Sequence, residues 1–108
     1  MMAREQNPGG IDLLILQLLS EKEMYGYEMV TELAKRSQSV FRLKEGTLYP
    51  LLHRLEKEGA VSAYEEKVEG RVRRYYRITR RGRGKLREQR EAWVRYAGAV
   101  NAVLCAAG

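Results

Sequence analysis

The residue types that build disulfides, metal sites and membrane spans are scarce in this chain. Cys105 is its only cysteine, so no disulfide can form within the chain, and we expect a cytoplasmic protein. His53 is its only histidine and lies far from Cys105 in sequence, so we expect no metal site. No apolar run reaches the roughly 18 residues of a membrane span, and MMAREQNPGG at the N-terminus lacks the apolar segment of a secretion signal. We therefore expect no membrane partner.

Motifs of catalysis are missing as well. The sequence contains no nucleophile motif, no paired-carboxylate pattern and no glycine-rich phosphate loop. Gly82-Arg83-Gly84 lacks the preceding strand and the lysine that such a loop requires. The sequence therefore predicts no catalytic residues, no cofactor and no enzymatic activity.

Positive charge is concentrated in one part of the chain. Residues 1–70 carry nine basic and twelve acidic side chains, residues 71–95 carry eleven and two, and the last thirteen residues carry none. The formal net charge of the whole chain is +6. A localised basic block is typical of a surface that binds a polyanion, although a solvated helix face would also be charged. We interpret the block as a nucleic-acid footprint.

The segment EGTLYPLLHRLEKEG, residues 45–59, predicts a short amphipathic helix. Its leucines recur at three- and four-residue spacing on one face, and Gly59 follows as a helix terminator. Polar, basic and aromatic side chains lie on the other face, as in a helix that enters the DNA major groove and also in many solvated helices. The candidate DNA contacts on this face are Thr47, Tyr49, His53 and Arg54. Because Pro50 lacks an amide hydrogen, either the helix starts near Tyr49 or its first turn is distorted.

Two flanking segments carry further candidate DNA contacts. Residues 25–36 predict a helix with Tyr25 and Tyr27 near its N-terminus, where each either contacts phosphate or packs inward. Residues 61–66 and 72–78 predict two strands of a hairpin, with residues 67–71 as the tip. Basic hairpin tips commonly lie along the DNA backbone, and the candidates here are Lys67, Arg71 and Arg73. Arg74 shares the parity of Val72 and Tyr76, which favours a structural role.

The chain is predicted to end in one long helix. Thr79 can cap its start, and an apolar seam with alternating spacings of four and three continues to Leu104. Such a helix outruns a small domain, and the segment 11–19 is apolar on nearly every side, so we expect a homodimer. The predicted interface residues are Ile11, Leu14, Ile15, Trp93, Ala97, Val100 and Leu104. Two copies of Trp93 would meet near the two-fold axis, where they either sandwich a flat aromatic ligand or only anchor the interface.

In this order, MYGYEMVTELAKRS, GTLYPLLHRLEKEG, the first strand and RRYYRIT resemble the PadR family of bacterial transcriptional regulators across residues 10–104. The resemblance implies a mainly helical winged helix-turn-helix with a small β-hairpin. It also implies a homodimeric repressor that binds double-stranded operator DNA, often tuned by a small molecule. Family members carry a proline in the reading-helix motif, which favours the distorted first turn. They often have a small capping residue where this chain has Lys44, whose side chain could contact phosphate instead.

The resemblance divides the chain into three parts and leaves three functions open. The parts are a flexible tail over residues 1–9, a DNA-binding domain over residues 10–79 and a dimerisation helix over residues 80–108. The first function is a repressor released by a small aromatic effector bound at Trp93, because some family members bind planar drugs or phenolic compounds in this region. The second is a regulator of the same fold without an effector. The third is an architectural module that binds nucleic acid without sequence preference.

Overall fold

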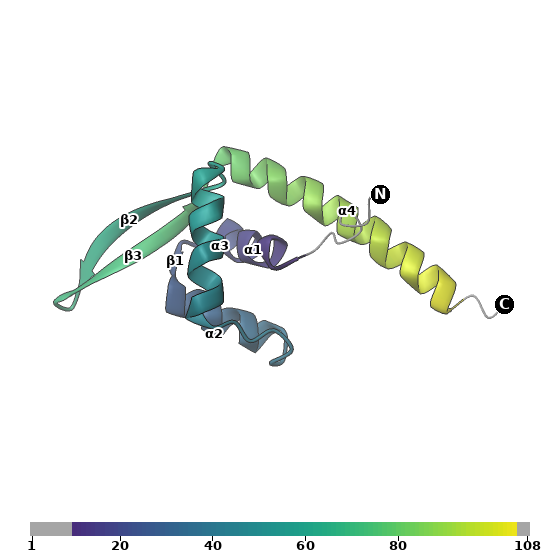
Figure 1. Ribbon diagram of the computed structural model, residues 1–108, viewed down its shortest axis with the longest axis horizontal. Helices are drawn as coiled ribbons and strands as arrows, with labels where there is room; N and C mark the ends of the chain where they lie inside the picture. The colour runs from purple at the N-terminus through teal and green to yellow at the C-terminus, as the bar shows by residue number, and fades with distance from the viewer. Residues whose placement is uncertain (1–9, 106–108) are drawn as a thin grey trace.

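The computed structural model describes residues 10–105, so the predicted tail over residues 1–9 lies outside it. Three helices and a three-stranded antiparallel sheet form the body, and a long helix leaves it (Figure 1). This arrangement of helices and hairpin is a winged helix, so the predicted fold is confirmed. The elements in chain order are α1 (Ile11–Glu21), β1 (Met24–Tyr25), α2 (Gly26–Arg36), α3 (Glu45–Lys57), β2 (Val61–Val68), β3 (Arg71–Ile78) and α4 (Arg80–Leu104).

The hydrophobic core lies between α1, α2, α3 and one face of the sheet. Of the four leucines in the predicted α3 stripe, Leu48, Leu52 and Leu55 are fully buried in the core, and Leu51 is partly buried. Ile15 of α1 is also fully buried within its own chain, so its predicted role in a subunit interface is wrong. The physical reason is that α2, β3 and α4 together pack around α1, whereas we had expected one domain to cover one face only. Ile11 and Leu14 remain partly exposed.

The β2–β3 hairpin is longer than predicted. Lys67 pairs with Val72 and Val68 pairs with Arg71, so the tip is only Glu69 and Gly70, both with left-handed φ angles of 51° and 80°. The short strand β1 adds to the other edge of β3 through Met24 and Tyr25. Because directly paired residues share a face, the rings of Tyr25, Tyr64 and Tyr75 line the outer face of the sheet, opposite the core.

Helix α3 begins at Glu45, so the alternative start near Tyr49 is wrong. The amides of Thr47 and Leu48 already donate to the Lys44 carbonyl, each at 2.9 Å. Pro50 is accommodated in the second turn, where it costs the helix one backbone hydrogen bond to Gly46. Lys44 occupies the N-cap position and makes no side-chain cap there, which leaves its ammonium group available for other partners.

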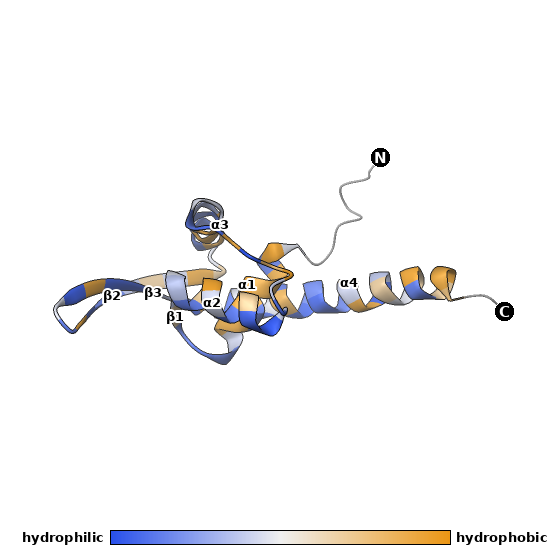
Figure 2. Cartoon of the chain, turned by 90° about the horizontal axis from the view of Figure 1, so that it is seen from below, coloured by the Kyte–Doolittle hydropathy of each residue, from blue (hydrophilic) through white to orange (hydrophobic). Residues whose placement is uncertain are grey.

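Helix α4 packs on the body only along its first half. Thr79 caps it as predicted, accepting a hydrogen bond from the Gly82 amide at 3.0 Å, and Leu86 is buried against the core. The second half extends away from the body and ends in apolar turns (Figure 2). Trp93, Val100 and Leu104 are exposed there. Within residues 10–105, no helix is both long and apolar enough to cross a bilayer, and no three metal-ligating side chains cluster.

Candidate nucleic-acid interface

Helix α3 presents an exposed outer side to solvent. Thr47, Tyr49 and His53 are all exposed there, because the buried leucines fix the opposite side of the helix against the core. Arg54, the fourth contact predicted on α3, is exposed as well, but its guanidinium is paired with acidic side chains. Gly46 lies on the same exposed surface, with open space where a Cβ would be. Sequence reasoning overlooked Gly46, although a helix whose second residue has no side chain offers its backbone to close approach.

Tyr49 lies directly over the start of α2. A Cβ at Gly26 would overlap the Tyr49 hydroxyl and would lie 2.9 Å from its Cζ atom, so a larger residue at position 26 would require the Tyr49 ring to move. Burial against this backbone, together with the nearby Glu45 and Tyr76, raises the pKa of Tyr49. The raised pKa favours the neutral phenol, whose hydroxyl can donate a hydrogen bond. This contact ties α3 to the N-terminus of α2.

A cleft of about 480 Å³ opens between the start of α2, Tyr49 and strand β3. Strand β1 pairs with β3 only at Tyr75 and Tyr76. The rest of that edge of β3, towards the hairpin tip, has no neighbouring strand within residues 10–105, and the cleft lies alongside it. Tyr27 is 63% exposed at its mouth. The residues lining the cleft are Tyr25, Gly26, Tyr27, Tyr49, Arg71, Val72, Arg73 and Arg74. Five of the predicted contacts, Tyr25, Tyr27, Tyr49, Arg71 and Arg73, thus meet in one concave surface.

Tyr25 and Arg73 are held together on the outer face of the sheet. The Tyr25 ring packs edge-on against Tyr75 at 5.4 Å between centroids, and the Arg73 guanidinium lies 4.5 Å from the Tyr25 ring centre. This cation–π contact orients Arg73 beside the cleft. The amide of Tyr25 donates to Glu28 at 3.0 Å, so part of the hydrogen-bonding capacity at the α2 N-terminus is already used. The polar groups that line the cleft are tyrosine hydroxyls and arginine guanidinium groups.

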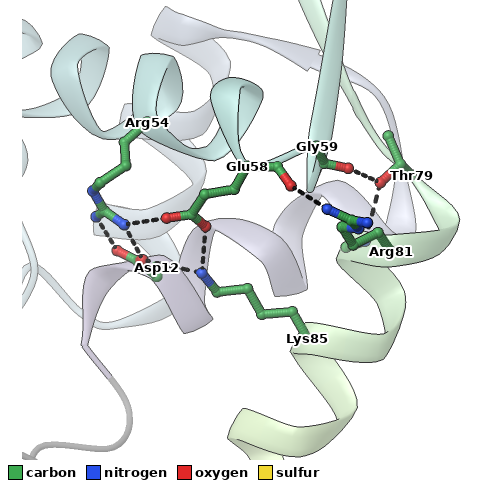
Figure 3. A network of polar contacts seen from close by, with 8 residues as sticks. Asp12, Arg54, Glu58, Gly59, Thr79, Arg81 and Lys85 are labelled. Atoms are coloured by element: carbon green, nitrogen blue, oxygen red, sulfur yellow. Dashed lines mark hydrogen bonds and ion pairs between the residues drawn. The ribbon is translucent and has the colours of Figure 1, made fainter.

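Arg54 is placed differently from its prediction as a DNA contact. Its guanidinium donates two hydrogen bonds to Asp12 of α1, at 2.9 and 3.0 Å, and a third to Glu58 at 3.3 Å (Figure 3). These partners raise the pKa of Arg54 and engage the side chain within the chain. Arg74 is similarly engaged by Glu56 at 3.2 Å, in agreement with the structural role favoured by its parity. Neither arginine is a prime candidate for DNA contact.

The basic block of residues 71–95 is divided by the fold. Its first part lies on the hairpin beside α3, whereas its second part lies on α4, which leaves the body on the other side (Figure 1). Among the described residues of this block, only Arg74, Arg77 and Lys85 pair with acidic side chains. Sequence analysis had treated the block as one footprint. The structure instead provides one basic surface at the cleft, with Arg71 and Arg73, and a separate one along α4.

Trp93 lies on the exposed half of α4 and has an aromatic neighbour that sequence analysis overlooked. Its ring centroid is 5.9 Å from that of Tyr96, at an interplanar angle of 35°. The two rings are 44% and 43% exposed. A spacing of three residues on a helix was the available signal for this pair. Towards the C-terminus the apolar surface continues along Tyr96, Ala99, Val100, Val103 and Leu104.

The family described as "Transcriptional regulator PadR-like family" matches residues 15–88. The chain belongs to the PadR-like family. Its members are transcriptional regulators and not enzymes, as the sequence predicted.

Individual proteins are similar to this chain over most of its length. An uncharacterized protein of Lysinibacillus sphaericus is 43% identical over 86 residues, which cover 79% of each chain. The transcriptional regulator Rv3488 of Mycobacterium tuberculosis is 39% identical over 89 residues, covering 82% of this chain and 80% of that protein. A solved transcriptional regulator from Clostridium thermocellum superposes with a TM-score of 0.79 at 35% identity, covering 84% of this chain and 89% of the other.

Proposed function

We propose that this PadR-like protein is a homodimeric repressor that reads operator DNA with α3 and binds the flanking phosphates around the cleft. The observation that carries the proposal is the convergence of α3, the α2 N-terminus and the basic hairpin on one concave surface. Thr47 and His53 face the base edges, and Tyr49 joins them. Tyr25, Tyr27, Lys44, Lys67, Arg71 and Arg73 serve the DNA backbone.

A competition assay tests this function. Operator DNA is first selected from a random pool by the purified protein. The selected sequence and a scrambled duplex of equal length then compete for binding at fixed salt. A specific regulator should prefer the operator by about a thousandfold or more. A preference near unity would instead favour an architectural module that binds nucleic acid without reading its sequence.

The dimer in this proposal is built from the exposed half of α4 and the partly exposed residues of α1. Trp93, Ala97, Val100 and Leu104 are the α4 contacts, with Ile11 and Leu14 on α1. The support is the apolar surface of α4 that no described part of the chain covers: Val103 is 78% exposed and Leu104 is 74% exposed. A second copy of the chain is the occupant that a two-fold arrangement supplies.

The effector in this proposal is a small aromatic molecule held by Trp93 and Tyr96. The support is that the two rings lie 5.9 Å apart and are both half-exposed, so a planar ligand can stack on them. The second candidate is a regulator without an effector, in which both rings only pack between subunits. Titration of the protein with planar aromatics, followed by Trp93 fluorescence, separates the two: saturable quenching supports an effector, and an unchanged spectrum supports the second candidate.

A further inference from the structure

Four charged side chains form a closed ring that joins α1, α3 and α4 (Figure 3). Arg54 binds Asp12 through two hydrogen bonds and also reaches Glu58. Glu58 accepts a hydrogen bond from Lys85 at 2.7 Å. The ammonium group of Lys85 lies 3.9 Å from Asp12, which closes the ring. The charges alternate around it, so each carboxylate lies between two cations.

The geometry of this ring constrains the relative orientation of the side chains that form it. Isolated pairs on a protein surface contribute little to stability, but a guanidinium that binds both oxygens of one carboxylate fixes the relative orientation of the two groups. Asp12 and Lys85 are also partly shielded, with side chains only 20% and 27% exposed. The hydrogen bond from Lys85, supported by Arg54, lowers the pKa of Glu58. The lowered pKa favours the charged form of Glu58, which the ring requires.

Two of the proposed reading residues lie at the N-terminal end of α3, whereas the ring holds the C-terminal end, next to the proposed contact His53. Two further hydrogen bonds hold the same end: Arg81 donates to the Glu58 carbonyl at 3.2 Å, and Thr79 donates to the Gly59 carbonyl at 2.6 Å. Thr47 and Tyr49 lie at the N-terminal end of this 13-residue helix, which is roughly 20 Å long. A change of tilt at the ring would consequently displace the reading residues.

We infer that Asp12, Arg54, Glu58 and Lys85 are positioning residues for DNA reading: they fix the angle of α3 against α1 and α4, and thereby the separation of the two reading helices. The inference rests on the proposed dimer and on α3 as the reading helix. It follows from the fact that α1 and α4, which carry the proposed subunit contacts, are the two helices that the ring attaches to α3. Dimeric proteins of this kind need half-sites at a fixed distance, about 34 Å for one helical turn.

The test measures preference for half-site spacing. The selected operator is compared with operators lengthened or shortened by one base pair, using the full-length protein. We expect Asp12→Asn and Lys85→Met to reduce the discrimination between these spacings by about tenfold relative to the wild-type protein. Lys85→Arg keeps the cation and should retain the wild-type preference. Glu21→Gln removes an ion pair of the same kind between α1 and Arg36 of α2, without contact to α3, and serves as the matched control.

Each outcome of this test has one meaning. Relaxed spacing preference in both ring variants, with wild-type behaviour in Lys85→Arg and Glu21→Gln, supports the positioning role. A lower melting temperature with unchanged spacing preference would show that the ring is structural only and would overturn the inference. If Thr47→Ala reduces operator preference while the ring variants keep the wild-type spacing preference, the proposed function stands and the ring inference fails. If wild-type protein shows no operator preference, the proposed function itself fails, and the inference fails with it.

Discussion

The hydroxyl of Tyr49 lies so close to Gly26 that a Cβ atom at this position would overlap it. One glycine on α2 and one tyrosine on α3 therefore set the distance between the two helices at the floor of the cleft. We expect Gly26→Ala to destabilise the protein by about 1–3 kcal/mol, because the added methyl group forces the ring away. The affinity of Gly26→Ala protein for operator DNA should fall as well.

A matched pair of variants checks this steric explanation. Gly84→Ala lies in α4, where nothing is within 4 Å of the new methyl group, so it should be neutral or stabilising by up to about 1 kcal/mol. Adding Tyr49→Phe to Gly26→Ala removes the overlapping hydroxyl and should recover part of the lost stability. Urea denaturation measures all three. Equal stability of Gly26→Ala and wild-type protein would refute the close contact.

Salt dependence distinguishes the two basic surfaces. Arg71 lines the cleft, whereas Arg87 lies on α4. Arg71→Ala should reduce the slope of log affinity against log salt by about one unit per DNA-bound subunit, since each lost phosphate contact releases fewer counterions. Arg87→Ala should leave the slope unchanged. The measurement is fluorescence anisotropy with labelled duplex over a range of salt concentrations, and an equal loss in both variants would contradict the division of the basic block.

The dimer proposal predicts a strong effect of charge on one side of α4 only. Val100→Glu places a carboxylate on the proposed interface, and burying an unpaired charge there is costly. We expect a monomer by analytical ultracentrifugation. Ala102→Glu adds the same charge on the other side of the helix and should leave a dimer. A dimeric Val100→Glu protein would rule out this face as the interface.

Acid should weaken the link between α1 and α2. The hydrogen bond from Arg36 lowers the pKa of Glu21 to about 2. A carboxylate with a lowered pKa stabilises the folded state at every pH above its unfolded value, and this contribution is lost as the pH falls towards 2. Wild-type protein should therefore lose more stability than Glu21→Gln between pH 5 and 2, by urea denaturation. Because Glu21 is solvent-exposed, the difference should shrink in high salt. Parallel pH profiles would contradict this role.

Local sequence patterns were sufficient to predict the four helices and the β2–β3 hairpin, but not the short strand β1. Leucine spacing predicted α3, and the parity of Arg74 predicted its structural role, because both depend on neighbours within one helix or strand. The patterns could not predict relations between elements. The prediction for Ile15 failed because its burial depends on how three other elements surround α1. The ion pair of Arg54 could not be foreseen because its partner Asp12 lies 42 residues away in the sequence. Gly26 suggested a close approach to another backbone, but the neighbour that it meets is the side chain of Tyr49 on α3.

The central claim is that the exposed side of α3 reads a DNA sequence. The most direct test measures the affinity of wild-type and Thr47→Ala protein for the selected operator and for a scrambled duplex, at one salt concentration. Thr47 is exposed, so its replacement should leave the fold intact. We predict a loss of operator affinity of about tenfold, corresponding to one lost base contact, with affinity for the scrambled duplex unchanged. If Thr47→Ala protein bound each duplex with the same affinity as wild-type protein, this would contradict the account and place sequence recognition elsewhere on the molecule.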